Sequence, residues 1–403
     1  MASLRRAAWR IAADLGQPQR LHTAKGGRMP ARKIVAAAVA AATAVTAAAI
    51  AAAPAASASQ TGPPYLSHFH RLKTIASTVP ANGDLNPYGV WIVRDSIGRL
   101  HRGNILVSNF NNKNNLEGTG STIVQITPSG RRTTFATINP RKLPGSCPGG
   151  VGLTTALTVL PFGWVIVGST PSKNGFVNTS GPGCLIVLNS HGQVKETISG
   201  QGINGPWDST VVVRGHFAYL FVTNVLHGTR RAHGKVVHRG IVLRITLTCC
   251  SRSTPPARVS TTTIASGYPQ RSDPAAFVIG PTGVGIGQHG LLYVAETLTN
   301  SIFQVPNALF RTTSAGQGRL LTKGGRLSMP LGLAIAPNSN ILTVNGGNGR
   351  IVETSESGVQ VFSRFLDRSG SPPGAGALFG LAVQDRSGVY YVDDAQNTLR
   401  LRH

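Results

Sequence analysis

The sequence is short of acidic residues and aromatic residues. Its 403 residues include only 14 Asp and Glu against 39 Lys and Arg, which gives the chain a formal charge of +25. Aromatic side chains make up 6% of the chain and do not alternate with basic residues, as they do in known nucleic-acid-binding modules. We therefore predict no specific nucleic-acid partner, although a basic protein is attracted to anionic surfaces in general.

Several catalytic and metal-binding motifs are also missing. The four cysteines include no C-x-x-C pair, the spacing of many zinc and redox sites. The chain after residue 58 has no G-x-S-x-G, no H-E-x-x-H and no glycine-rich phosphate loop with its lysine. These absences favour a binding protein over an enzyme, and they leave a metal-dependent hydrolase as the enzyme class to consider.

Only one long apolar run occurs, and it lies near the N-terminus. Arg32 and Lys33 precede the alanine-rich run 34–53, and Ala56–Ala58 then supply small residues in an A-x-A pattern. This order of basic, apolar and small residues is typical of a secretory signal. The alternative is an uncleaved membrane helix, since the run is long enough to span a bilayer. Because alanine is only weakly apolar, we favour cleavage between Ala58 and Ser59.

The cleavage prediction divides the chain into a leader, residues 1–58, and a mature domain, residues 59–403. Met29 begins a short basic segment of ordinary length, so translation from Met29 is an alternative to Met1. Alanine-rich signals of this kind are typical of high-GC bacteria. We expect a bacterial protein that is secreted or held in the cell envelope, with no stable membrane span after cleavage.

A glycine-containing apolar strand recurs six times after the leader, and each copy is followed by a second and a third strand. Clear copies are 281–305, 330–354 and 378–401. The short β-branched and aromatic segments in each copy fit sheet interiors. Their spacing is that of four-stranded propeller blades. The six inner strands begin near Tyr88, Val151, Trp207, Thr282, Leu331 and Phe379.

The outer strands predict how the ring closes. Five outer strands follow their third strands, but the chain stops at His403 just after the sixth third strand. A matching segment, Arg71–Val79, precedes the first inner strand. We therefore predict an all-β, six-bladed β-propeller in which this N-terminal strand pairs with 398–401 and completes the last blade. Such closure leaves no exposed sheet edge.

The best copy of the repeat resembles the NHL repeat. In Pro281–Val305 the residues Tyr293, Glu296, Asn300 and Ile302 fall in register with that motif. The same six-bladed shape is shared by the gluconolactonase-like (SMP-30-type) hydrolases, to which NHL proteins look related. The resemblance implies an architecture more than an activity.

Polar residues gather where the second strands end and the inner strands begin, at one face of the predicted ring. That face surrounds the channel, the default ligand site of a propeller. The alternative is that these side chains bond the backbone of turns within their own blades. The candidate ligand-binding residues are Asn86, Asn109, Asp208, Asn224, Glu296, Asn345 and Asp393.

Glu296, Asn345 and Asp393 are the candidate metal ligands, because carboxylate and amide oxygens suit Ca²⁺. The gluconolactonase-like resemblance implies a metal-binding Glu at the first inner strand, with an Asn and an Asp from other blades. Asn86 stands where that Glu is expected, while Asn224 or Asn345 could serve as the Asn and Asp393 as the Asp, although no motif identifies them. No cofactor is certain from the sequence, and a divalent cation such as Ca²⁺ is the one the residues suggest.

Two further features concern the second and third blades. Cys147 and Cys184 fall at the same face of blade 2, so we predict a disulfide between them, and we leave the pairing of Cys249 and Cys250 open. Residues 227–239 form a basic loop in blade 3, which is either an anion-binding element or a solvated hairpin.

Two classes of function follow from the sequence. The first is an exported propeller that binds a protein, a glycan, a small ligand or an anionic cell-surface polymer at its channel face. The second is a metal-dependent, lactonase-like hydrolase, in which a divalent ion polarises a carbonyl group.

Overall fold

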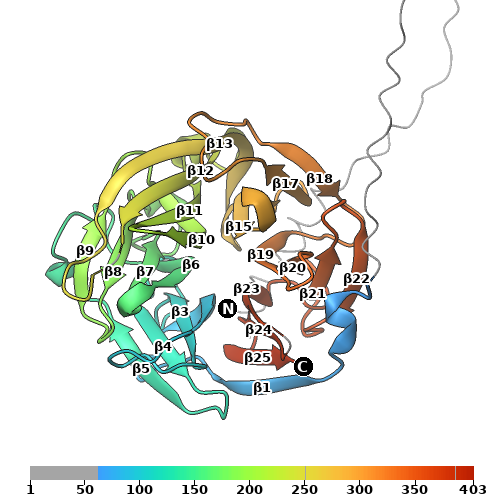
Figure 1. Ribbon diagram of the computed structural model, residues 1–403, viewed down its shortest axis with the longest axis horizontal. Coiled ribbons are helices and arrows are strands. Elements are labelled where there is room, and N and C mark those ends of the chain that lie inside the picture. Colours follow the sequence, from blue (N-terminus) through green and yellow to red (C-terminus); the bar gives the residue numbers. More distant parts are fainter. Residues whose placement is uncertain (1–61, 250, 386) are drawn as a thin grey trace, which may run out of the picture.

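Six antiparallel sheets surround a central axis in the computed structural model (Figure 1). The structure describes residues 62–249, 251–385 and 387–403. The predicted leader, Met29 and the cleavage site at Ala58 and Ser59 lie outside the described residues, as does Cys250. The six blades that we predicted from the repeat are confirmed.

Each blade begins with an inner strand that lines the axis and continues with a second strand next to it. The inner strands are β2 (Leu85–Ile92), β6 (Leu153–Leu160), β10 (Gly205–Arg214), β15 (Pro281–Ile286), β19 (Pro330–Ile335) and β23 (Leu378–Gln384). The second strands are β3 (Ile105–Asn111), β7 (Trp164–Ser169), β11 (Phe217–Val225), β16 (Leu292–Glu296), β20 (Ile341–Asn345) and β24 (Gly388–Asp393).

Third and outer strands complete the blades. The third strands are β4 (Thr122–Ile126), β8 (Cys184–Leu188), β12 (Val237–Thr248), β17 (Ser301–Val305), β21 (Arg350–Thr354) and β25 (Thr398–Arg402). The outer strands are β5 (Arg132–Thr137), β9 (Val194–Ile198), β13 (Arg258–Asp273), β18 (Arg319–Lys323), β22 (Gln360–Phe365) and β1 (Leu72–Ser77).

Helices are few and short. None of them, within the described part of the chain, is long and apolar enough to cross a membrane. They are η1 (Tyr65–His68), η2 (Pro140–Lys142), η3 (Pro161–Gly163), η4 (Val177–Thr179), α2 (Thr229–Ala232) and η5 (Gln288–Gly290).

The N-terminal strand closes the ring as predicted. β1 runs antiparallel to β25, with Leu72 opposite Arg402 and Ser77 opposite Thr398. Figure 1 shows β1 along the rim of the blade that contains the C-terminus. The last blade therefore takes strands from both ends of the described chain, and β25 has no free edge.

The glycine that recurs in the inner strands is explained by contact between neighbouring blades. A Cβ atom on Gly332 would lie 2.3 Å from the carbonyl oxygen of Phe379, and one on Gly380 would lie 2.0 Å from that of Tyr88. Real Cβ atoms do not approach backbone oxygens so closely. Glycine therefore lets adjacent inner strands pack together around the axis.

The third blade has one strand more than we predicted. The outer strand β13 continues as far as Asp273, and β14 (Phe277–Ile279) pairs with its end. The sequence hides this extension because Gly267 and Pro269 are typical of loops. The chain between β13 and β15 is thereby folded into the ring, where it meets the residues that fill the channel.

The predicted disulfide in the second blade is confirmed. Cys147 and Cys184 are bonded, with their Cα atoms 5.2 Å apart. Their bond closes a loop over a sequence separation of 37. Reduction removes the constraint that this loop places on the unfolded chain.

Replacing Cys147 by Ser is therefore expected to lower the free energy of unfolding by about 3–4 kcal/mol. Urea unfolding of the oxidised wild-type protein and of the variant measures this difference. The double variant Cys147→Ser/Cys184→Ser should match the single variant, because either change breaks the same bond. A single variant as stable as the wild type would contradict the prediction.

Candidate functional site

A group of aromatic rings fills the channel where the inner strands begin. Tyr88 of blade 1 stacks on Phe379 of blade 6 at 4.1 Å between ring centroids and meets Trp207 of blade 3 at 5.5 Å. Phe110 contacts both Trp207 and Phe277, each at 5.6 Å. All five rings are buried. Because blades 1 and 3 are not neighbours, their contact crosses the axis, and we call these five residues the aromatic plug.

Beyond the plug, the later parts of the inner strands surround an open central cavity. It has a volume of about 400 Å³, within the usual range for small-molecule sites. Arg94, Pro337 and Asp385 lie at its rim, in turns between inner and second strands, and all three are exposed. The cavity therefore opens at the face opposite to the one that we predicted from the sequence.

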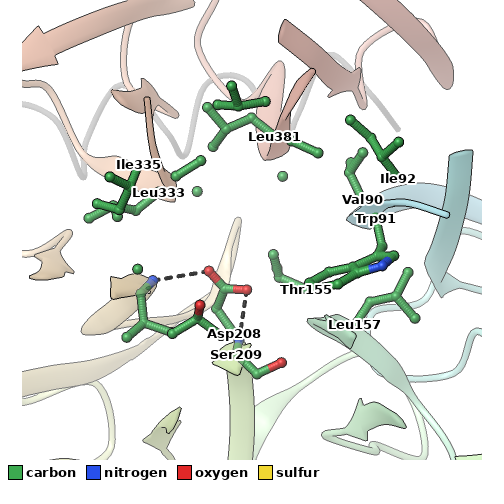
Figure 2. Close-up of a pocket in the computed structure, with 18 of the residues that line it drawn as sticks. Val90, Trp91, Ile92, Thr155, Leu157, Asp208, Ser209, Leu333, Ile335 and Leu381 are labelled. Carbon is green, nitrogen blue, oxygen red and sulfur yellow. Dashed lines mark hydrogen bonds between the residues drawn. The ribbon is translucent and has the colours of Figure 1, made fainter. Parts of the chain in front are cut away.

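The walls of this central cavity are largely aliphatic. Residues of all six inner strands form these walls, and Figure 2 shows the carboxylate of Asp208 pointing into the cavity. Asp208 is the only one of the seven candidate residues among those lining the cavity. The aliphatic side chains labelled in Figure 2 are Val90, Ile92, Leu157, Leu333, Ile335 and Leu381.

Two backbone N–H groups hold the Asp208 carboxylate. Ser209 donates to Oδ1 at 2.8 Å, and Val284 of the next blade donates to Oδ2 at 3.1 Å. A β-bulge between Pro206 and Ser209 interrupts the pairing of β10 with β11 at this point. Such a bulge redirects a side chain. The other five inner strands have a register shift at the same place, where Gly283 and Gly332 correspond to Asp208. Blade 3 therefore presents a carboxylate where those blades have glycine, and the Val284 N–H links it to blade 4.

A hydroxyl group fixes the backbone beside the carboxylate. The N–H of Asp208 donates to Thr223 Oγ1 at 3.0 Å, and that hydroxyl donates to the carbonyl oxygen of Thr282 at 2.6 Å. All three residues are buried. Asp208 is therefore held in place by both neighbouring strands before any ligand arrives.

Burial raises the pKa of Asp208 from 3.8 to about 7, against the opposing effect of the N–H groups of Ser209 and Val284. Near neutral pH the carboxyl group is consequently divided between its charged and neutral forms. A cationic or hydrogen-bond-donating ligand would favour the charged form.

The other six candidates lie at the plug face, and all except Asn86 use their side chains in bonds within the protein. Asn224 Oδ1 accepts from the N–H groups of Asn204 and Gly205 at 3.0 and 2.8 Å. Asn109 Nδ2 donates to the carbonyl oxygen of Thr78 at 3.1 Å. The backbone N–H of Asn86 donates to Asn397 Oδ1 at 2.8 Å. Among these contacts, only those of Asn224 match the turn-bonding alternative, because the side-chain oxygens of Asn86 and Asn109 are buried without a hydrogen-bond partner among the described residues. The two interpretations of these candidates therefore stay open.

The three candidate metal ligands come from three different blades. Both carboxylate oxygens of Glu296 accept from residues 298 and 299 of its own turn. Asp393 Oδ2 lies 3.0 Å from Arg400 Nη1, and Asn345 Nδ2 donates to the carbonyl oxygen of Arg326 at 2.8 Å. Among the described residues no group of three or more His, Cys, Asp or Glu could hold a metal ion. A role for these side chains in ligand or metal binding stays a prediction.

The buried carboxyl groups lead us to expect lower stability at higher pH. Burial raises the pKa of Asp208, Glu296 and Asp393 to about 7. The folded protein therefore binds these protons more tightly than the unfolded chain. Their stabilisation is complete below pH 4 and is lost as the pH rises to 7. Asp208 alone should contribute a slope of up to about 1.4 kcal/mol per pH unit.

Urea unfolding between pH 5 and pH 8 tests this dependence. The free energy of unfolding should fall across the range in the wild type, and more gently in Asp208→Asn. Burial lowers the pKa of His227, so this imidazole makes stability rise with pH. Its effect opposes that of the three carboxyl groups but should not outweigh it. If Asp208→Asn and the wild type show the same slope, Asp208 does not titrate in this range.

Comparison with known proteins supports the fold and leaves the family open. No family model matches the sequence, and no curated protein matches it. Among solved structures, a gluconolactonase from Xanthomonas campestris is 11% identical with a TM-score of 0.51, and the alignment covers 82% of this chain and 88% of that one. At this identity the likeness shows a shared fold only.

Two more solved structures are similar at lower TM-scores. Regucalcin, a calcium-binding protein from Agrobacterium tumefaciens, is 11% identical with a TM-score of 0.48, over 82% of this chain and 93% of that one. Virginiamycin B lyase from Staphylococcus aureus is 11% identical with a TM-score of 0.46, over 82% of this chain and 98% of that one. The resemblance to NHL repeats stays a prediction.

Sequence reasoning missed the plug, although a signal for part of it was present. Tyr88, Trp207 and Phe379 occupy matching places at the beginnings of three inner strands. In a ring of blades, side chains at equivalent positions of the inner strands face one another across the axis. Large side chains there fill the channel, so an aromatic residue in these places predicts a closed end.

Proposed function

We propose that the protein is an exported six-bladed propeller that binds a small, largely apolar ligand in its central cavity. The ligand carries an amine or another hydrogen-bond donor that meets Asp208. One observation carries this proposal, namely a single buried carboxylate inside an aliphatic cavity of about 400 Å³. Aliphatic walls with one well-placed polar group are the usual composition of small-molecule sites.

The hydrogen bonds of Asp208 support a binding role. Each carboxylate oxygen accepts one backbone N–H. An ionised carboxylate has about four acceptor positions, so each oxygen keeps capacity for a ligand group. Asp208 is buried, and a charge-assisted hydrogen bond is stronger at a buried group than in water.

Export is the second part of the proposal. It rests on the predicted signal over residues 1–58 and is supported by the Cys147–Cys184 disulfide, since such bonds persist in oxidising compartments. The basic composition is consistent with attraction to an anionic cell surface.

Titration of the intact protein with n-hexylamine and n-hexanol tests the binding role. Isothermal calorimetry should detect saturable binding of both probes. Asp208→Asn should weaken the binding of n-hexylamine by about tenfold or more, because a charge-assisted hydrogen bond is lost. The same variant should weaken the binding of n-hexanol less. Leu333→Trp should abolish binding of both, because the indole ring would fill the cavity.

Asp385→Asn at the exposed rim is the matched control, since it removes the same charge without changing the interior. Equal weakening by Asp385→Asn and Asp208→Asn would rule out a specific contact with Asp208. Failure of the wild type to bind either probe saturably would overturn this ligand class.

The lactonase-like hydrolase is the second candidate, favoured by the fold shared with a gluconolactonase. Its proposed metal ligands do not fit a metal site well, because Glu296 and Asp393 already bond other groups. Elemental analysis of the purified protein separates the two functions. One equivalent of a divalent metal that disappears in Glu296→Gln or Asp393→Asn would favour the hydrolase.

A further inference from the structure

A second pocket lies at the loop that joins β11 to β12. Three arginines, Arg230, Arg231 and Arg239, line it together with the apolar residues Leu226 and Val237. Its volume is about 480 Å³. Loops between second and third strands lie at the plug face of the ring, so this pocket and the central cavity open on opposite faces. We call it the arginine pocket.

The arginines of this pocket have no protein partners in the described part of the chain. The ion pairs found there involve Arg271 and Arg400 only, and no side-chain hydrogen bond of Arg230, Arg231 or Arg239 occurs. All three are exposed. The sequence contributes to this excess of positive charge, because it has no acidic residue between Asp208 and Asp273.

The backbone around the arginine pocket positions Arg239. Gly228 has a φ of +81°, and a Cβ atom there would lie 3.2 Å from Arg239 Cδ and 3.6 Å from its Nη1. The glycine therefore leaves room for this side chain to lie against the loop. Gln270 Nε2 donates to the carbonyl oxygen of His227 at 2.9 Å and joins the beginning of the loop to β13.

We propose that the arginine pocket binds a phosphomonoester group. Each guanidinium group can donate two parallel hydrogen bonds to phosphate oxygens. A phosphomonoester carries between one and two negative charges near neutral pH and offers three oxygens, enough to engage several guanidinium groups at once. The apolar residues Leu226 and Val237 would contact the carbon skeleton that bears the phosphate. This site is independent of the function proposed for the central cavity.

Calorimetric titration of the intact protein with inorganic phosphate tests the proposal. Saturable binding is expected in the wild type, and the triple variant Arg230→Ala/Arg231→Ala/Arg239→Ala should weaken it by about tenfold or more. Leu333→Trp, which fills the central cavity, should leave phosphate binding unchanged. Phosphate binding and binding of the amine probe can therefore fail separately.

The control variant removes the same charge elsewhere. Arg102, Arg131 and Arg141 are exposed, and their side chains make none of the hydrogen bonds or ion pairs found in the described residues. Arg102→Ala/Arg131→Ala/Arg141→Ala should bind phosphate as the wild type does. Equal weakening by the two triple variants would show a general attraction to positive charge and overturn the pocket. Absence of saturable binding in the wild type would overturn it as well.

His227 supplies a readout inside the loop. Burial and the nearby Arg239 charge both lower the pKa of this imidazole. A phosphate bound to Arg239 would offset its charge, so the pKa of His227 measured by NMR should rise when phosphate saturates the protein. An unchanged His227 pKa at saturation would place the bound phosphate elsewhere and contradict the proposal.

Vesicles identify the source of the phosphate group. Two kinds of phosphatidylcholine vesicle are compared. Those that contain phosphatidic acid offer a lipid phosphomonoester, and those without it do not. Binding to phosphatidic acid that free phosphate displaces would identify a membrane lipid as the ligand, whereas phosphate binding without vesicle binding would identify a soluble phosphomonoester. Vesicle binding that survives in Arg230→Ala/Arg231→Ala/Arg239→Ala would contradict the arginine pocket.

Discussion

A chain that begins at Pro80 is expected to aggregate and to lose cooperative unfolding. The deletion removes β1, which covers the edge of β25, and also removes Tyr65, Leu66 and Phe69, which are buried against blades 5 and 6. An exposed strand edge pairs readily with other chains. The loss of apolar burial also weakens the contact between the last two blades.

Sedimentation and thermal unfolding of the shortened chain test this expectation. A chain that begins at Pro64 is the control, because it keeps η1 and β1 and should unfold as one cooperative unit. The closure contributes little to the fold if the chain that begins at Pro80 is monomeric and unfolds at the same temperature as the control.

The repeat allowed the ring and its closure to be predicted from the sequence. A strand is recognised from the alternation of its side chains with a period of two, which involves only residues close in the sequence. The alternation can therefore be seen in each blade even where the amino acids themselves differ from blade to blade. The missing sixth outer strand then required a partner, and Arg71–Val79 was the segment left over. The disulfide followed from the same register, because Cys147 and Cys184 fall at one face of blade 2.

The strand repeat alone did not show in which direction the channel opens. That direction depends on which side chains meet across the axis, and the one signal for it in the sequence was the aromatic residues at matching places in three inner strands. Tyr88, Trp207 and Phe277 come together only when the ring is closed. The segment that carries Phe277 also follows an irregular stretch with Gly267 and Pro269, which local patterns assign to a loop.

Asp208 was one of seven candidate residues predicted from the sequence, and nothing in that prediction separated it from the other six. Its six companions lie near the ends of strands at the plug face. Asp208 instead lies within the register shift that all six inner strands share, and it points into the central cavity. The residue pattern does show that Asp208 stands where Gly283, Gly332 and Gly380 occur in other blades, but only the closed ring shows that this place faces the cavity.

Glu353 was not predicted from the sequence, yet its side chain joins three parts of the fold. This buried residue of β21 accepts the backbone N–H groups of Tyr65 and Leu66 at 2.7 and 2.8 Å. It also accepts from Asn338 Nδ2 at 3.1 Å and Asn340 Nδ2 at 2.6 Å. Its carboxylate therefore fastens the segment before β1 to the turn between β19 and β20.

Replacing Glu353 by Ala is expected to lower the free energy of unfolding by about 5 kcal/mol. Four donors would lose their acceptor, and each unsatisfied buried donor costs roughly 1–3 kcal/mol. Glu353→Gln should cost less, because the amide keeps one acceptor oxygen. Asp95→Ala, at an exposed position after β2, is the control and should change stability by about 0.5 kcal/mol or less, as is usual for surface substitutions.

Urea unfolding and amide hydrogen exchange measure the effect of Glu353→Ala. Exchange should accelerate first at Tyr65 and Leu66 and then along β1, since the carboxylate holds the segment that leads into this strand. Slower or unchanged exchange at these amides, together with a stability equal to that of Asp95→Ala, would show that the N-terminal segment is held by its apolar contacts alone. The two readouts thus separate the anchoring role of Glu353 from general destabilisation of blade 5.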